Sequence, residues 1–195
     1  MRTALHLTRW WLGVDAARTQ TTPAERACLV RWATGRRVAV EIGVFEGVTT
    51  AALRRALAPD AVLFAIDPFF PGRLGICYGR WIARGEVAGS ARVVWLRCLG
   101  RDAPPRFRAV SGPPADFVFV DADHSYEGIR GDFEAWRPLI AEGGIIAFHD
   151  SAPVPDMPRF LIENSVRYVD EVVARDPDFT AVGTLDSLRV FRRVR

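Results

Sequence analysis

Lysine is absent from this sequence of 195 residues, and all 26 of its cationic side chains are arginines. The arginines are scattered, and we find no basic stripe interleaved with aromatic residues, the mark of a nucleic-acid-binding face. With 23 acidic residues, the formal net charge is +3 at neutral pH. We therefore expect no nucleic-acid partner, and any catalytic base must be a residue other than lysine.

Cysteine is scarce, with three residues far apart in the sequence: Cys28, Cys77 and Cys98. Their number is odd and no two of them form a C-x-x-C pair, so neither a zinc site nor a disulfide framework is expected. This cysteine usage fits a protein kept in the reducing cytoplasm, which is the predicted location.

Long apolar runs are also missing. No stretch approaches the roughly 20 residues that a membrane-spanning helix needs, so we expect no membrane association. The N-terminal sequence MRTALHLTRWWLGVDAA has a faint likeness to a secretion signal, but His6 and Arg9 interrupt its short apolar part. We interpret residues 1–20 as an amphipathic arm that serves as a lid or as a dimer contact.

The residues that are present suffice for one globular domain. Hydrophobic types make up 49% of the chain, charged types 25% and aromatic types 11%. This balance allows a substantial core and argues against disorder. We therefore expect a single domain over residues 21–195, preceded by the arm.

Short apolar runs alternate with segments of helical character. The predicted strands lie at 37–42, 61–67, 92–98, 116–123 and 143–150, and FTAVGT and SLRVFRRV form a terminal pair. The predicted helices lie at 22–33, 49–57, 78–88, 125–141 and 157–175. The alternation predicts an α/β fold: a doubly wound, mostly parallel, seven-stranded sheet with helices on both faces and an antiparallel C-terminal strand.

Polar side chains stand at the ends of four predicted strands. They are Glu41, Asp67, the segment Asp121 to His124, and the pair His149 and Asp150. Open α/β sheets bind ligands beyond the carboxyl ends of their strands, where the strand order reverses. Acids and histidines at this edge therefore predict a functional site rather than a core.

The segment VEIGVFEGVTT joins the first predicted strand to a helix. Gly43 and Gly47 permit a tight turn and close approach of a ligand to the backbone, and the helix start at Thr49 offers N–H groups and hydroxyls to an anion. Asp67 stands where nucleotide-binding folds place a ribose-binding acid. Phe45 occupies the position of the middle glycine of the dinucleotide fingerprint, so a ligand with a carboxylate fits better than a pyrophosphate.

Three segments, EIGVFEGVTT, FAID and DFVFVDADH, resemble those of S-adenosylmethionine-dependent O-methyltransferases of the caffeoyl-CoA and catechol type. The runs VDADHSYEGIRGDFEAW and GGIIAFHD also resemble a broader group of bacterial small-molecule methyltransferases that includes antibiotic-tailoring enzymes. The resemblance covers about residues 36–151. It implies a Rossmann-like methyltransferase fold, S-adenosylmethionine as cofactor, and a phenolic or sugar hydroxyl of a small molecule as acceptor. By analogy, the arm would support a homodimer.

The resemblance implies roles for the residues of the first loop. Gly43, Phe45 and Gly47 would bring the backbone close to the methionine part of the cofactor. Glu41 would lie near the amino group or the ribose, and Thr49 would hydrogen-bond the carboxylate.

The resemblance also implies that Asp67 binds the two ribose hydroxyls and that Asp121 lies close to the sulfonium. Two departures from the family pattern stand out. Where the family has a small polar segment near the adenine, this chain reads CLGRDAPP, which leaves Asp102 as a weak candidate. Glu46 replaces a small residue and adds a charge beside the cofactor loop.

Metal-dependent members of this family hold a divalent cation at positions that match Asp121, His149 and Asp150. Two carboxylates suit Mg²⁺, whereas a histidine shifts the preference toward manganese, iron or zinc. The cation would lower the pKa of a substrate hydroxyl and orient its oxygen. In the alternative interpretation, His149 and Asp150 only hydrogen-bond the loop 151–158 and no metal binds.

His124 replaces the family's lysine after VDAD, the residue thought to deprotonate the acceptor. The unperturbed pKa of histidine lies near neutrality, so His124 is a candidate general base. It could instead only cap the following helix, although Ser125 or Asp123 can do that. His149 is a second candidate base, in a site without metal.

Two other function classes remain open at this stage. One is a nicotinamide-dependent oxidoreductase on a similar sheet, against which Phe45 and the absence of lysine count. The other is a non-catalytic relative that keeps the fold and binds the cofactor. The intact site residues Gly43, Gly47, Asp67 and Asp121 argue against decay of the site.

Overall fold

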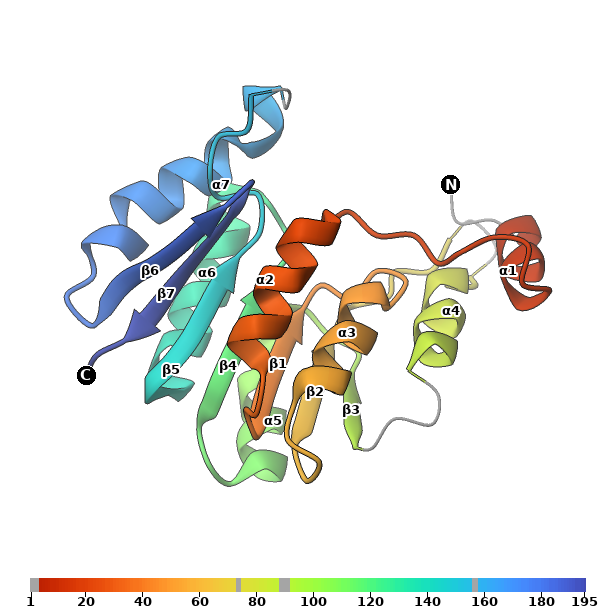
Figure 1. Cartoon of the computed structure of the whole chain (residues 1–195), viewed down its shortest axis with the longest axis horizontal. Coiled ribbons are helices and arrows are strands. Elements are labelled where there is room, and N and C mark those ends of the chain that lie inside the picture. Colours follow the sequence, from red (N-terminus) through yellow and green to blue (C-terminus); the bar gives the residue numbers. More distant parts are fainter. Residues whose placement is uncertain (1–3, 73–74, 88–91, 156–157) are drawn as a thin grey trace.

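The computed structural model describes residues 4–72, 75–87, 92–155 and 158–195, and Figure 1 shows its elements in chain order. The strands are β1 (Val38–Ile42), β2 (Val62–Ile66), β3 (Val93–Leu96), β4 (Ala115–Val120), β5 (Ile140–Phe148), β6 (Phe179–Leu185) and β7 (Leu188–Arg193). The α-helices are α1 (Ala4–Trp11), α2 (Pro23–Ala33), α3 (Val48–Ala56), α4 (Tyr78–Glu86), α5 (Pro104–Ser111), α6 (Tyr126–Trp136) and α7 (Arg159–Glu171). Short 3-10 helices are η1 (Gly100–Asp102), η2 (Arg137–Leu139) and η3 (Val173–Arg175).

The described strands form one seven-stranded sheet in the order β3-β2-β1-β4-β5-β7-β6. Strands β1 to β5 are parallel, and β7 is antiparallel to both of its neighbours. The last residue of β1, Ile42, is in register with Ile66 of β2 and with Val120 of β4. The predicted fold class is confirmed, and the residues that follow these strands meet at one edge of the sheet.

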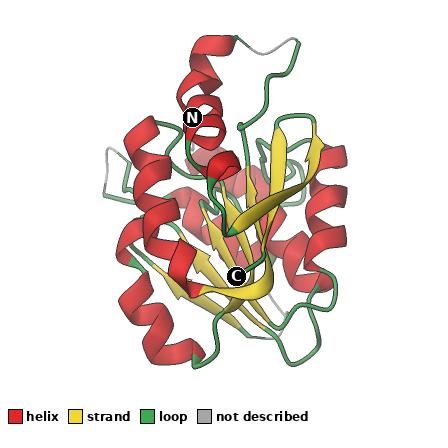
Figure 2. Cartoon of the chain, turned by 90° about the vertical axis from the view of Figure 1, so that its left-hand side faces the viewer, coloured by secondary structure: helices red, strands yellow, loops and turns green. Residues whose placement is uncertain are grey.

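Helices cover both faces of the sheet, as Figure 2 shows. One face packs on α5, α6 and α7 through Phe107, Phe133 and Tyr168, and the other packs on α2 and α3 through Leu29 and Leu53. All five residues of β1 and all five of β2 are buried. Burial on both faces explains why these strands read as continuous apolar runs rather than as alternating ones.

Local sequence signals account for several boundaries. The Thr22 hydroxyl accepts a hydrogen bond from the Glu25 backbone N–H, and the Glu25 carboxylate accepts one from the Thr22 backbone N–H, which makes a capping box at the start of α2. Gly47, with φ of 82°, is the N-cap of α3. Pro138 lies in the short turn η2 that follows α6, so the predicted helix 125–141 ends earlier, at Trp136.

Two helices were not predicted. The segment read as CLGRDAPP runs into α5, which has proline at its first helical positions, where no backbone hydrogen bond is lost. The arm contains α1, which packs against α4 because Gly85 leaves room for the Trp10 ring. Position 157, where the last long helix was predicted to begin, lies outside the described residues. None of the described helices is both long and apolar enough to cross a bilayer.

Candidate functional site

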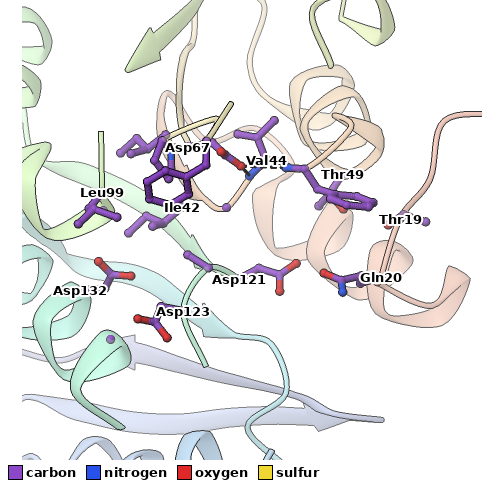
Figure 3. A pocket seen from close by; sticks show the side chains of 18 of the residues that line it. Thr19, Gln20, Ile42, Val44, Thr49, Asp67, Leu99, Asp121, Asp123 and Asp132 are labelled. Carbon is purple, nitrogen blue, oxygen red and sulfur yellow. Dashed lines mark hydrogen bonds between the residues drawn. The ribbon is translucent and has the colours of Figure 1, made fainter. Parts of the chain in front are cut away.

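A cavity of about 400 Å³ opens at the carboxyl edge of β1, β2 and β4. Figure 3 shows the side chains around it. Leu99 and Asp132 lie at one end, Asp67 and Asp121 lie between, and the arm residue Gln20 lies at the other end. The cavity is therefore elongated, with carboxylates at several points along its length.

The loop after β1 forms one wall of this cavity. Gly43 has φ of 94°, and a Cβ atom there would lie 1.9 Å from the carbonyl oxygen of Asp121. Phe45, which also lines the cavity, has φ of 56°. Gly47 does not line it, because it faces α4, where a Cβ atom would lie 2.7 Å from the Ala83 Cα. Both glycines are thus required by close backbone approach, the first beside the cavity and the second behind it.

Asp67 fixes the shape of this loop. Its Oδ2 accepts hydrogen bonds from the backbone N–H groups of Val44 at 3.0 Å and Phe45 at 3.1 Å. Its Oδ1 accepts one from the N–H of Phe69 at 2.6 Å. Because a carboxylate has about four acceptor positions, Oδ1 can still accept from a ligand in the cavity that it lines.

Glu41 does not line the cavity. It lies two residues after Ala39 in β1 and so points to the same face as Ala39, the face that packs on α2 and α3. Its side chain is fully buried, and neither carboxyl oxygen makes a hydrogen bond within the described part of the chain. Burial raises the pKa of Glu41 well above its ordinary value, and the charges of Asp121 and Asp67 add to this effect. Glu41 therefore lies behind the loop, in surroundings that favour the neutral form of its carboxyl group.

The arm closes the far end of the cavity. Arg18, Thr19 and Gln20 line it, and the Thr21 hydroxyl lies 3.2 Å from the hydroxyl of Thr49, which also lines it. In Figure 1 the segment between α1 and α2 crosses the edge at which β1 ends. Residues 18–20 of the arm therefore form part of the cavity wall, and the roles of lid and dimer contact both stay predictions.

Glu46, predicted only as an unexplained charge, contacts two residues of the arm. Its side chain is fully buried. Its Oε2 lies 3.0 Å from the Nε2 of His6 and accepts a hydrogen bond from the backbone N–H of Arg18 at 2.7 Å. The loop and the arm are thereby joined by one carboxylate.

A cluster of two imidazoles and two carboxylates adjoins the cavity at Asp121. The Oδ1 of Asp121 lies 3.0 Å from the Nδ1 of His149 and 3.4 Å from the Nε2 of His124. The Oδ2 of Asp150 lies 2.9 Å from the Nδ1 of His124 and 3.5 Å from the Nδ1 of His149. The structure thus brings together all four residues that were predicted to act in metal binding or proton transfer.

Glu25 holds His149 from the opposite side. Its Oε2 lies 3.2 Å from the Nε2 of His149, and its Oε1 accepts from the backbone N–H and the hydroxyl of Ser187. Burial alone would raise the pKa of Glu25, but hydrogen bonds from His149 and Ser187 lower it to about 2. Sequence analysis missed Glu25 because its partners lie 124 and 162 residues away.

The carboxylates dominate the electrostatics of both imidazoles. Burial alone would lower the pKa of His149, but the neighbouring Asp121 and Glu25 raise it to about 10. Burial alone would also lower the pKa of His124, but Asp121 and Asp150 raise it to about 9. The cluster therefore favours positive charge strongly.

Asp132 is a second residue that sequence analysis missed. It belongs to α6, is 4% exposed and lines the cavity beside Leu99 and Gly100. The weak candidate Asp102 is exposed and does not line the cavity. The sequence does contain an indication of this burial. Asp132 shares a helix face with the apolar residues Ile129 and Trp136, where a charged side chain is unusual.

Comparison with known proteins adds an independent finding. The family described as "Methyltransferase domain" matches residues 40–151, which is more than half of the chain. A curated relative, the uncharacterized protein y4gI of Sinorhizobium fredii, is 26% identical over 120 residues, or 60% of this chain. The chain spans 13% of the length of that relative.

Several solved structures share the fold. The O-methyltransferase TomG from Streptomyces achromogenes, in complex with SAM, has a TM-score of 0.68 and 21% identity, over 97% of this chain and 87% of its own. An O-methyltransferase from Bacillus cereus, in complex with SAH, has a TM-score of 0.65 and 19% identity, over 96% of this chain and 87% of its own. A methyltransferase from Geobacter sulfurreducens has a TM-score of 0.63 and 16% identity, over 98% of this chain and 87% of its own. At these identities the likeness establishes the fold.

Proposed function

The chain belongs to the methyltransferase domain family, as the sequence resemblance implied, and we propose that it transfers a methyl group from S-adenosylmethionine to a hydroxyl oxygen of a small molecule. The observation that carries this proposal is the position of Asp121, which lines the cavity and also belongs to the histidine cluster. A methyl donor in the cavity and an acceptor at the cluster would therefore be neighbours. Family membership favours this function over a nicotinamide-dependent oxidoreductase.

The cavity fits the proposed cofactor. The Gly43 backbone forms a cradle that a side chain would fill, the N-terminus of α3 with Thr49 suits a carboxylate, and Asp67 in mid-cavity suits ribose hydroxyls. Bound there, the cofactor supplies a methyl group on a sulfonium, whose transfer needs alignment of the acceptor oxygen more than it needs catalytic groups. Thr49 and the arm would hold the amino-acid end, and Asp67 the ribose.

We propose that Asp121, His149 and Asp150 hold a divalent cation. Asp121 Oδ1 and His149 Nδ1 are buried and 3.0 Å apart, and they pair with each other when His149 is protonated. With His149 neutral, both atoms would be free to bind a cation. Asp121, His149 and His124 can place three ligand atoms within 4.8 Å of one another, and Asp150 Oδ2 lies 3.5 Å from His149 Nδ1. A cation at this point would stabilise negative charge on the acceptor oxygen.

Glu25 supports the assignment of His149 as a ligand rather than a base. A metal-binding histidine usually donates its other ring N–H to a carboxylate, which fixes the tautomer. Glu25 is placed to accept from His149 Nε2, which leaves Nδ1 facing Asp121. The imidazole nitrogen in the donor set favours manganese, iron or zinc relative to a site of oxygen atoms alone.

His124 is the proposed base of the cation-loaded site, because a cation held at Asp121 would offset the carboxylates that raise the pKa of His124. Its side chain is 26% exposed, against 3% for His149, so an acceptor can reach it more easily. Asp150 lies 2.9 Å from its Nδ1 and can orient the ring, while Nε2 faces Asp121. A proton taken from the acceptor hydroxyl would pass to Nε2.

The acceptor would enter beside the loop after β2. Phe70 of that loop lines the cavity and is 72% exposed, which offers a surface for a phenolic or sugar ring. The charged and polar side chains of Arg18 and Gln20 flank the opposite end. We propose a small-molecule acceptor on this basis.

Calorimetric titration with S-adenosylhomocysteine tests the cofactor assignment. We expect micromolar binding, no comparable binding of NADH, and a change in affinity or enthalpy when Mn²⁺ or Mg²⁺ is added. Asp67→Ala should weaken the binding at least tenfold. If folded protein binds neither ligand, the proposed function is wrong, and a degenerate relative that keeps the fold without binding the cofactor gains weight.

A further inference from the structure

We propose that Asp132 accepts a hydrogen bond from the 6-amino group of the cofactor's adenine and makes the site selective for that base. This inference rests on the proposed function, because it assumes that an adenosyl compound occupies the cavity. Neither the family resemblance nor the loop after β3 points to α6 as the source of this contact.

The order of groups along the cavity leads to Asp132. Asp67, the ribose-binding candidate, lies between the arm end and the Asp132 end, as Figure 3 shows. If Thr49 and the arm hold the amino acid, the base must lie on the other side of Asp67. That side is lined by Leu99 and Ile42, whose apolar side chains suit the faces of a purine ring.

Contacts with the η1 turn hold the Asp132 side chain in place at this end of the cavity. The backbone of Arg101 hydrogen-bonds to its carboxylate. A Cβ atom on Gly100 would lie 2.4 Å from Asp132 Oδ1 and 2.3 Å from Ile42 Cγ2. The glycine therefore lets the η1 turn close onto the carboxylate, and this packing fixes Asp132 without filling the cavity.

The Asp132 carboxylate can accept from a further donor, because a carboxylate has about four acceptor positions and the Arg101 backbone is one donor. The side chain of Asp132 is almost entirely buried, and the charge of Arg101 lies near enough to oppose the effect of burial on its pKa. Burial raises the pKa of Asp132 to about 7, and the charges of Asp123 and Asp102 add to this effect. The 6-amino group is the hydrogen-bond donor that adenine presents on its ring edge, and a carboxylate is an acceptor.

Two other carboxylates near this end are weaker candidates. Asp102 is exposed and does not line the cavity. Asp123 lines it but is exposed, and its Oδ1 already accepts from the backbone N–H of Ser125 at 3.0 Å. Only Asp132 among these three is both buried and open to the cavity.

The experiment compares two ligands in wild-type protein: S-adenosylhomocysteine and its 6-deamino analogue, in which hydrogen replaces the amino group. Loss of the hydrogen bond to the buried Asp132 oxygen predicts that the deamino analogue binds roughly tenfold more weakly. Equal affinities would overturn the inference without any variant. If neither compound binds, the proposed function fails first, so the two failures are distinguishable.

Variants then assign the selectivity to one residue. Asp132→Leu should reduce the ratio of the two affinities to about one, whereas Asp132→Asn, which keeps an acceptor oxygen, should retain part of it. Asp102→Asn is the matched control and should keep the wild-type ratio. A ratio that survives Asp132→Leu, or that collapses only in Asp123→Asn, would assign the contact elsewhere. Circular dichroism checks that each variant is folded, and a misfolded Asp132→Leu leaves the wild-type comparison decisive.

Discussion

The Nε2 of His6 lies 3.0 Å from Oε2 of Glu46, although the two residues are 40 positions apart. His6 belongs to α1 and Glu46 to the loop after β1, and both side chains are buried. The same oxygen accepts from the backbone of Arg18, which lines the cavity. One carboxylate therefore couples the arm to the wall of the cofactor site.

Loss of this coupling should weaken ligand binding. Glu46→Ala removes the acceptor shared by His6 and Arg18, so closure of the arm over the cavity should become less favourable. We expect S-adenosylhomocysteine to bind about three- to tenfold more weakly, measured by calorimetry. Thr8→Ala is the control, because its hydroxyl contacts only Ala4 within α1 in the described structure. Unchanged affinity in Glu46→Ala would show that the arm is not a lid.

A methyl group at position 43 should be far more damaging than one at another left-handed glycine. Gly43→Ala would place Cβ 1.9 Å from the Asp121 carbonyl oxygen, whereas a Cβ atom on Gly35, which has φ of 74°, would meet no atom within 4 Å in the described structure. Gly35→Ala should therefore lose only the roughly 1–2 kcal/mol of backbone strain. Thermal unfolding of both variants measures the difference, and similar losses would contradict the close approach of the two loops.

Sequence analysis predicted the edge of the sheet well, because the information there is local. An apolar run that ends in an acid marks a strand end, and the parallel register then brings Asp67 and Asp121 to one edge. The Gly43 turn is likewise indicated by adjacent residues. These features depend on neighbours in the chain and on a fold class that alternation specifies.

Groups brought together by packing were not predictable in the same way. Glu25 caps its own helix, and no local pattern indicates that it also meets His149 and Ser187. Asp132 could be noticed as a charge on an apolar helix face, but its cavity exists only once η1 packs on α6. Long-range contacts of this kind follow from tertiary structure rather than from periodicity.

Glu25 should matter for metal affinity although it does not face the proposed cation. Glu25→Gln would weaken the hydrogen bond that orients His149 through its Nε2. Loss of such a partner typically reduces metal affinity by about 10- to 100-fold. Electron paramagnetic resonance of free Mn²⁺ during titration gives the affinity without any assay of activity. Asp123→Asn, a change two residues from Asp121 but outside the cluster, should leave it unchanged. Equal Mn²⁺ affinity in Glu25→Gln and wild type would refute the positioning role.

Asp132 should make the stability of the ligand-free protein fall as the pH rises. Its pKa is raised to about 7 in the fold, by burial first and then by Asp123 and Asp102, against the opposing effect of Arg101. The unfolded chain, with an ordinary aspartate pKa, releases this proton at lower pH, so between about pH 4 and pH 7 the folded state binds more protons. Deprotonation then costs stability, by up to roughly 3 kcal/mol between pH 5 and pH 8.

Asp132→Asn cannot titrate and keeps an oxygen that can accept from the Arg101 backbone. Relative to wild type, this variant should therefore gain stability as the pH is raised from 5 to 8. Chemical denaturation at several pH values, without ligand, measures the difference in unfolding free energy. A difference that stays constant over this range would mean that Asp132 is already ionised in the fold at pH 5. A difference that grows with pH would show that the carboxylate is held, in the absence of ligand, in a site that favours its protonated form.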